Sequence, residues 1–191
     1  MAGQLAASTA KSYRELSDDL GDLEHGWSTL RELSLNEQVN TRFQRAADRF
    51  AALLQASLFA YCVALVGRLL EDITAGRKKT CSLRTILAEA AADGFDVKQL
   101  QRRLRDANRS ARKIIAARHE RIAHNSYAVL VEGTEHQLFT FAEFDATVAA
   151  LTALMNDFER LVGIRPIDYR ASEGAAGLRV LATLLAGTQT G

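Results

Sequence analysis

The sequence has few residues that interrupt or cross-link a chain, since its 191 residues include one proline and two cysteines. Cys62 and Cys81 lie far apart and show no metal-ligand spacing. This argues against a disulfide scaffold and favours a reducing compartment. The N-terminal segment also lacks a basic stretch followed by an apolar one, so we find no export signal and expect a cytoplasmic protein.

Strong β-formers are scarce too, while Ala and Leu dominate an apolar content of 48%. This composition predicts an all-α protein, and the length suffices for one domain with a substantial core. We expect that domain over residues 1–165 and a tail over 166–191, in which "LRVLATLLA" forms a short helix. The formal net charge of +1 by itself excludes no class of partner.

Apolar periodicity and capping signals divide the domain into helices. Asp96 with Gln99, and Thr140 with Glu143, have the spacing of capping boxes. The β-branched and aromatic residues around Gly133 suggest a small hairpin or an ordered loop near 127–141. The predicted helices cover about 8–32, 37–74, 83–93, 97–123 and 141–163.

One apolar segment, residues 51–67, is as long as the shortest membrane span, and arginines flank it. Its bulky residues nevertheless follow a helical rhythm, and Gln55 and Ser57 interrupt it. We therefore expect a long helix buried in a bundle or a dimer interface, with no membrane contact. The residues on this rhythm are Phe43, Phe50, Leu54, Leu58, Tyr61, Leu65 and Leu69.

The segment 97–123 carries two opposite stripes at steps of three and four residues. The apolar stripe is Val97, Leu100, Leu104, Ala107, Ala111 and Ile114, and the basic stripe is Lys98, Arg102, Arg105, Arg109 and Arg112. A solvated helix face normally alternates acids with bases, which this stripe hardly does. Two interpretations remain, a solvated face and a track for the phosphates of a polyanion such as RNA.

The sequence "AARHERIAHNSY", residues 116–127, follows the apolar stripe. Arg118 is the next position inward after Ile114, and an arginine there needs an anionic partner or a cleft. His119 and His124 are five residues apart, which turns their imidazoles about 140° from each other on a regular helix. They cannot share one ion in that geometry, so we predict no zinc site and no other cofactor.

An arginine, then a histidine, then a second histidine near a helix end resembles the signature of the HEPN superfamily. That signature is an arginine, four to six residues and a histidine, with Asn, His or Asp commonly just after the arginine; here five residues separate Arg118 from His124. The segment "RLLEDITAGRKKTCSLRTIL" is similar to the AbiU-like branch, named for an abortive-infection protein that confers phage resistance. The resemblance covers about residues 36–160.

The resemblance implies an all-α, up-and-down bundle of four to six helices that forms a two-fold homodimer. It also implies metal-independent cleavage of RNA in phage defence or a toxin–antitoxin circuit, with a cognate antitoxin as a further partner. His124 would act as general acid or base and Arg118 as phosphate clamp. The supporting residues would be His119 and Asn125 as orienting groups, Arg121 as a second phosphate contact, and Glu120 beside His124.

Structural interpretations of the same residues stay open. His124 and Asn125 would also suit the C-terminal end of a helix, and Arg118 could pair with Glu71 or Asp72. The alternatives to a ribonuclease are therefore a non-catalytic module that binds RNA or a nucleotide, and a purely structural helical dimer.

Overall fold

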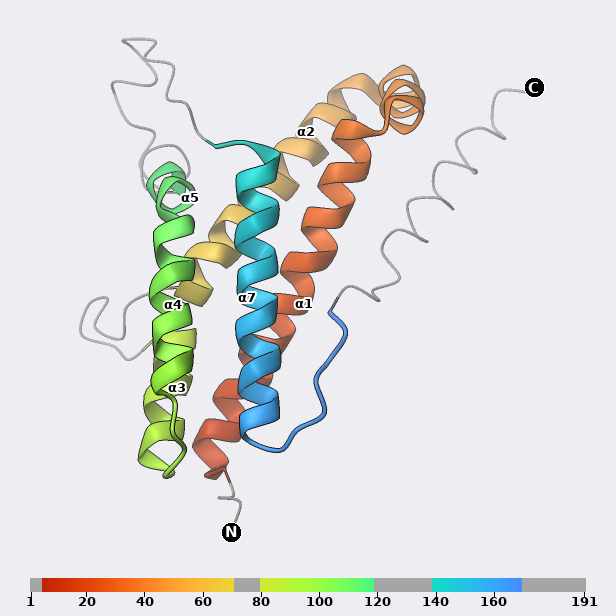
Figure 1. Ribbon diagram of the computed structural model, residues 1–191. Helices are drawn as coiled ribbons and strands as arrows, with labels where there is room; N and C mark the ends of the chain where they lie inside the picture. Colours follow the sequence, from red (N-terminus) through yellow and green to blue (C-terminus); the bar gives the residue numbers. More distant parts are fainter. Residues whose placement is uncertain (1–4, 71–79, 119–138, 170–191) are drawn as a thin grey trace.

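The computed structural model describes residues 5–70, 80–118 and 139–169, and within these ranges all regular secondary structure is helical (Figure 1). The predicted all-α bundle is therefore confirmed. The last residues predicted for the second helix, most of the predicted hairpin, and the tail helix lie outside the described residues. The helices are α1 (Ala7–Leu35), α2 (Glu37–Leu70), α3 (Leu83–Ala92), α4 (Lys98–Ser110), α5 (Arg112–Ala117) and α7 (Phe141–Leu161).

The core lies between α1, α7, α3, α4 and the C-terminal part of α2. Along α1, one buried face recurs at steps of three and four residues, through Leu16, Leu20, Leu23, Trp27 and Leu30. Such a stripe forms a stable helix because it packs against neighbours rather than through propensity alone. α4 and α7 lie side by side in front of α1 (Figure 1).

Helix ends follow the local chemistry that the sequence predicts, with one exception. The Thr140 side chain accepts from the Glu143 N–H at 3.1 Å, and Glu143 accepts from the Thr140 N–H at 2.7 Å, which confirms that capping box. α7 ends just before Gly163, whose φ is +78°. The Asp96–Gln99 capping box is wrong as predicted, because α4 begins one residue later with Val97 as its N-cap. The Asp96 carboxylate instead accepts a hydrogen bond from the Lys98 N–H at 3.3 Å.

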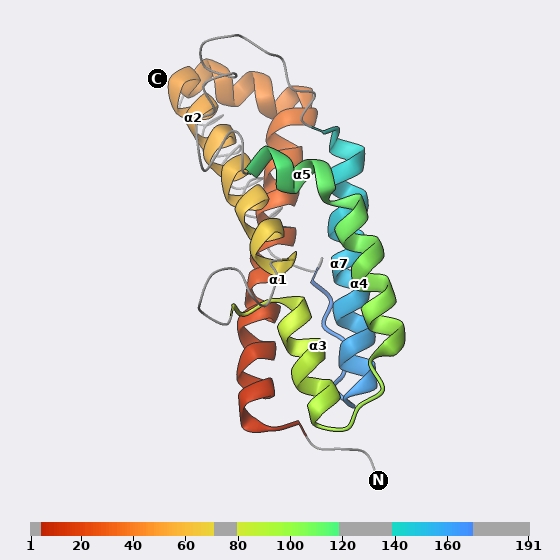
Figure 2. The same ribbon diagram turned by 90° about the vertical axis from the view of Figure 1, so that its left-hand side faces the viewer.

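The helix predicted over 97–123 is also wrong in one respect, because it is broken at Ala111. Just before this break, two polar side chains donate hydrogen bonds to backbone carbonyls four residues earlier in the chain. Asn108 Nδ2 donates to Leu104 O at 3.0 Å, and Ser110 Oγ donates to Asp106 O at 3.2 Å. Such bonds compete with the backbone ladder and bend helices. α5 therefore turns away from α4 and crosses toward α2 (Figure 2).

The two halves of α2 have different surroundings. Its C-terminal residues from Cys62 to Leu70 supply much of the core. Among the earlier α2 side chains that the structure describes, only Phe43 and Ala51 are buried, in a small cluster with Leu33. The bundle of one chain covers only part of the apolar face of α2, since Phe50 is 56% and Tyr61 44% exposed, and whether a dimer interface covers the rest stays a prediction. Asp48–Leu70 is long and apolar enough to cross a membrane by length and composition, and 33% of an apolar 18-residue stretch within it is buried.

A buried carboxylate fastens the segment after α7 to the bundle. Glu159 is fully buried, and its Oε1 accepts hydrogen bonds from the hydroxyls of Tyr13 (2.9 Å) and Tyr169 (2.7 Å). Its Oε2 accepts from the Ile167 N–H at 2.9 Å. Burial and the neighbouring Glu159 raise the pKa of Tyr13 to about 12, so this phenol remains a donor at neutral pH.

Candidate functional site

Of the residues predicted to perform chemistry, the structure describes Arg118, at the C-terminal end of α5. His119, Glu120, Arg121, His124 and Asn125 lie outside the described residues. So do Glu71 and Asp72, the acids considered as structural partners of Arg118. The geometry of the candidate site therefore rests on Arg118, the end of α2 and the basic stripe.

The side chain of Arg118 lies directly on the backbone of α2. It is partly buried, and a Cβ at Gly67 would stand 2.5 Å from its Cδ and 2.6 Å from its Nη1. α5 brings it there because Ile114 and Ala117 are buried on the same side of this short helix. The bend at Ala111 thus places Arg118 against α2 instead of continuing the axis of α4.

The neighbouring arginine of α2 has a different environment. Arg68 Nε lies 2.9 Å from Asp19 Oδ2 of α1, and its Nη2 lies 4.0 Å from Glu15 Oε2. Burial raises the pKa of Asp19, and the positive charge of Arg68 opposes that rise. Arg68 is therefore neutralised by α1, whereas no acid within the described ranges pairs with Arg118.

The predicted basic stripe is exposed along its whole length. Its members are Lys98, Arg102, Arg105, Arg109 and Arg112, on the side of α4 and α5 opposite the buried stripe. In the part of the chain that the structure describes, one of these five has an ion pair, Arg109 with Asp106 at 3.6 Å, and both of those side chains are largely exposed. The stripe therefore presents a row of nearly uncompensated positive charge.

Two other cations of this segment have a structural role that the sequence did not reveal. Arg103 pairs with Asp157, and Lys113 Nζ lies 2.6 Å from Glu143 Oε1, so both tie α4 and α5 to α7. The hydrogen bond from Lys113 lowers the pKa of Glu143. The structure thus separates cations that hold the bundle together from cations that are available to a ligand.

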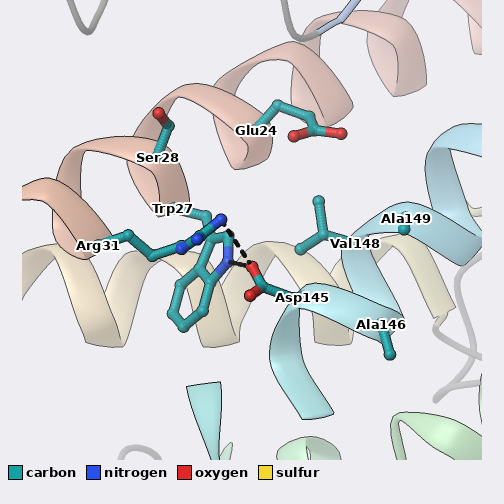
Figure 3. Close-up of a pocket in the computed structure, with 8 residues that line it drawn as sticks. All are labelled: Glu24, Trp27, Ser28, Arg31, Asp145, Ala146, Val148 and Ala149. Atoms are coloured by element: carbon teal, nitrogen blue, oxygen red, sulfur yellow. Dashed lines mark hydrogen bonds and ion pairs between the residues drawn. The ribbon is translucent and has the colours of Figure 1, made fainter. Parts of the chain in front are cut away.

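A hollow of about 480 Å³ between α1 and α7 is a second feature that the sequence did not predict (Figure 3). Trp27 Nε1 donates to Asp145 Oδ1 at 2.7 Å, and Arg31 Nη1 lies 3.2 Å from the same oxygen. Glu24 Oε1 accepts from the Thr152 hydroxyl at 2.6 Å. Because these polar groups are paired with one another, we interpret them as ties between α1 and α7.

Neither cysteine is a candidate nucleophile or metal ligand. Cys62 is buried, which raises the pKa of its thiol to about 12, and burial also raises that of Cys81. Among the described residues, no group of three or more His, Cys, Asp or Glu side chains is placed to hold a metal ion.

Comparison with known proteins assigns the chain to a family. Residues 8–171 match the family model HEPN_AbiU2, described as AbiU2, so the chain belongs to this family of HEPN domains. The match begins within α1 and therefore includes the first helix as well as the segment 36–160 that carries the resemblance. No curated protein and no solved structure matches the chain.

Proposed function

We propose that this member of the AbiU2 family is a metal-independent endoribonuclease that acts as a two-fold homodimer in phage defence or a toxin–antitoxin system. The observation that carries the proposal is the position of Arg118. This guanidinium is partly buried at the junction of α5 and α2, has no acid partner within the described ranges, and follows a row of exposed cations. A phosphate is the ligand that such a group fits best.

The proposed reaction needs only the RNA and side chains of the motif. The 2′-oxygen attacks the adjacent phosphorus while the bond to the 5′-oxygen breaks, which leaves a 2′,3′-cyclic phosphate and a 5′-hydroxyl. His124 takes the proton of the attacking hydroxyl or supplies one to the leaving oxygen, since an imidazole titrates near neutral pH. Arg118 holds the phosphoryl oxygens as their charge grows. His119, Glu120 and Asn125 orient His124, and Arg121 makes a second phosphate contact.

The basic stripe is the proposed track for the RNA backbone. Lys98, Arg102, Arg105, Arg109 and Arg112 line one side of α4 and α5, and the chain then reaches Arg118 within two helical turns. Phosphate contacts of this kind position a nucleic acid without reading its sequence. They also make the affinity fall steeply with salt.

The proposed dimer completes the site with residues of a second copy. Its support is the exposed apolar surface of α2, where Phe50 is 56% and Leu53 64% exposed. Large apolar side chains at such a density in one helix are typical of an interface. A cognate antitoxin is a further partner that the proposed biological role includes, and the proposal places the protein in the cytoplasm.

The alternative is a non-catalytic module that binds RNA or a nucleotide. The exposed basic stripe supports this function as well as it supports a ribonuclease. Cleavage of a mixed RNA pool in EDTA separates the two functions, with His124→Ala, Arg118→Ala and the matched control Arg14→Ala, an exposed arginine of α1. We expect wild type and Arg14→Ala to leave cyclic phosphate ends and the other two variants to lose about 10²-fold or more.

Binding without cleavage by the wild type would favour the alternative function. If the wild type neither cleaves nor binds RNA, a structural helical dimer would be the remaining interpretation.

A further inference from the structure

A glycine inside a long helix calls for a physical reason. Gly67 lies near the C-terminal end of α2, inside regular helix and without a positive φ, so no turn requires it. Glycine also weakens a helix relative to alanine, because the unfolded chain loses more freedom at that position. At Gly67 the structure supplies a reason, a contact that a side chain would block.

That contact is the side chain of Arg118. A Cβ at position 67 would stand 2.5 Å, 2.6 Å and 2.9 Å from the Cδ, Nη1 and Nε atoms of Arg118. Three atoms of one arginine thus occupy the space that any side chain at position 67 would need. The surface left open by Gly67 holds both the stem and the head of Arg118.

Among the described residues, the neighbours of Gly67 in α2 point elsewhere. Arg68, the next residue of α2, is directed to α1, where its Nε lies 2.9 Å from Asp19 Oδ2. Val66 and Leu69 are fully buried in the core. Gly67 itself is buried, while Arg118 remains partly exposed and so can still meet a ligand.

We infer that Gly67 is a positioning residue for Arg118: its bare α-carbon is the platform that fixes the guanidinium in its phosphate-binding orientation. This inference rests on the proposed function. An arginine that is already packed on a rigid helix loses less freedom when it binds phosphate, and its orientation does not have to be found during the reaction. The platform acts through Arg118 and touches no substrate.

The decisive variant is Gly67→Ala, compared with Gly21→Ala. Each change adds one methyl group to a long helix and raises helix propensity, but a Cβ at Gly21 meets nothing within 4 Å. At Gly67 the methyl group displaces the flexible arginine and leaves the core in place. We expect unfolding temperatures at or above that of the wild type for both variants, with cleavage lowered about 10²-fold in kcat by Gly67→Ala alone.

A double-mutant cycle tests whether Gly67 acts through Arg118. In the Arg118→Ala background the displaced group is gone, so adding Gly67→Ala should lower cleavage no further. Losses that multiply, or a Gly67→Ala variant as active as Gly21→Ala, would overturn the inference and leave the ribonuclease intact. A wild type that does not cleave, with Arg118→Ala no different, would instead overturn the proposed function and the inference with it.

If Gly67→Ala does not fold, the inference can still be tested by a measurement on the wild-type protein. The ¹⁵N signal of the Arg118 Nε–H group, identified by its absence in Arg118→Lys, should be resolved and slow to exchange with water in the free protein. A signal that is averaged with those of the exposed stripe arginines would show that nothing fixes the guanidinium, and the inference would be wrong.

Discussion

α1 and α2 are the two longest helices that the structure describes, and they pack against each other, yet they bury their apolar residues very differently. The apolar face of α1 is covered from Tyr13 to Leu33 by the rest of the chain. α2 is comparably covered only from Cys62 onward, and Phe50 and Leu53 remain exposed. The chain itself covers the apolar face of α1 as far as Leu33, whereas it leaves part of the apolar surface of α2 uncovered.

This difference divides α2 into a covered part and an uncovered part. The covered part, near its C-terminal end, belongs to the core and carries Gly67, on which Arg118 lies. The uncovered part offers an apolar surface to something outside the chain, which we propose is a second copy. The same helix would thus connect the dimer interface to the candidate site, as a site composed of two protomers requires.

The largest effect is expected from a charge placed in the uncovered part of α2. Leu53→Glu should convert the proposed dimer to a monomer in light scattering at micromolar concentration, because a carboxylate cannot be buried there without a partner. Cleavage should fall by orders of magnitude, since the proposed site needs both protomers. Thr41→Glu, an exposed polar position of the same helix, is the matched control.

A wild type that is monomeric under these conditions would remove the composite site. Recovery of the wild type in the membrane fraction, with Leu53→Glu in the soluble one, would instead assign this apolar surface to a lipid bilayer.

The second test compares the same side-chain truncation, leucine to alanine, in the two helices. Leu23→Ala in α1 empties a fully buried position and should lower the free energy of unfolding by about 2–5 kcal/mol. Leu53→Ala in α2 should change it by less than about 0.5 kcal/mol when the protein is dilute enough to be monomeric. Urea unfolding of both variants measures the difference, and equal losses would mean that the chain itself covers Leu53.

The third test uses two tyrosines, one in each helix. Tyr13 donates to the buried Glu159, whereas Tyr61 donates at 2.7 Å to Asp22, where the pair is exposed. Tyr13→Phe should cost about 1.5–3 kcal/mol, because a buried carboxylate loses a donor, and Tyr61→Phe should cost less than about 1 kcal/mol.

The pH dependence of Tyr13→Phe has a definite sign. The folded pKa of Tyr13, about 12, lies above its ordinary value of 10.0, so its stabilisation is complete below pH 10 and is lost as pH rises toward 12. The stability gap between wild type and Tyr13→Phe should therefore narrow over that interval. A gap that is constant from pH 9 to 12 would contradict the proposed bond to Glu159.

The parts of the fold that local chemistry determines were predictable from the sequence. The bounds of α7 follow from Thr140, Glu143 and Gly163, and the buried stripe of α4 follows from its spacing. The break at Ala111 was missed because Asn108 and Ser110 are compatible with a helix, and only their bonds to carbonyls four residues back bend it.

Contacts between residues far apart in the sequence could not be predicted, for a different reason. Gly67 and Arg118, or Arg103 and Asp157, lie about fifty positions apart and meet only after the helices have packed. Spacing identified Arg118 as an unusual residue and the stripe as a set of cations. It could not show which cations α7 neutralises, nor which backbone supports the arginine.

The smallest effects are expected in α4, where two arginines that are two residues apart in the sequence differ in whether they have an ion-pair partner among the described residues. Arg105→Gln should weaken RNA binding a few-fold and reduce the slope of log affinity against log salt by about 1, with no change in stability. Arg103→Gln should leave binding and slope as they are and lower stability by at most about 1 kcal/mol, because its partner is Asp157. Fluorescence anisotropy with a short single-stranded RNA at several salt concentrations measures both. Equal effects on binding would mean that the charge of the whole segment attracts RNA, and that the exposed stripe is not a distinct interface.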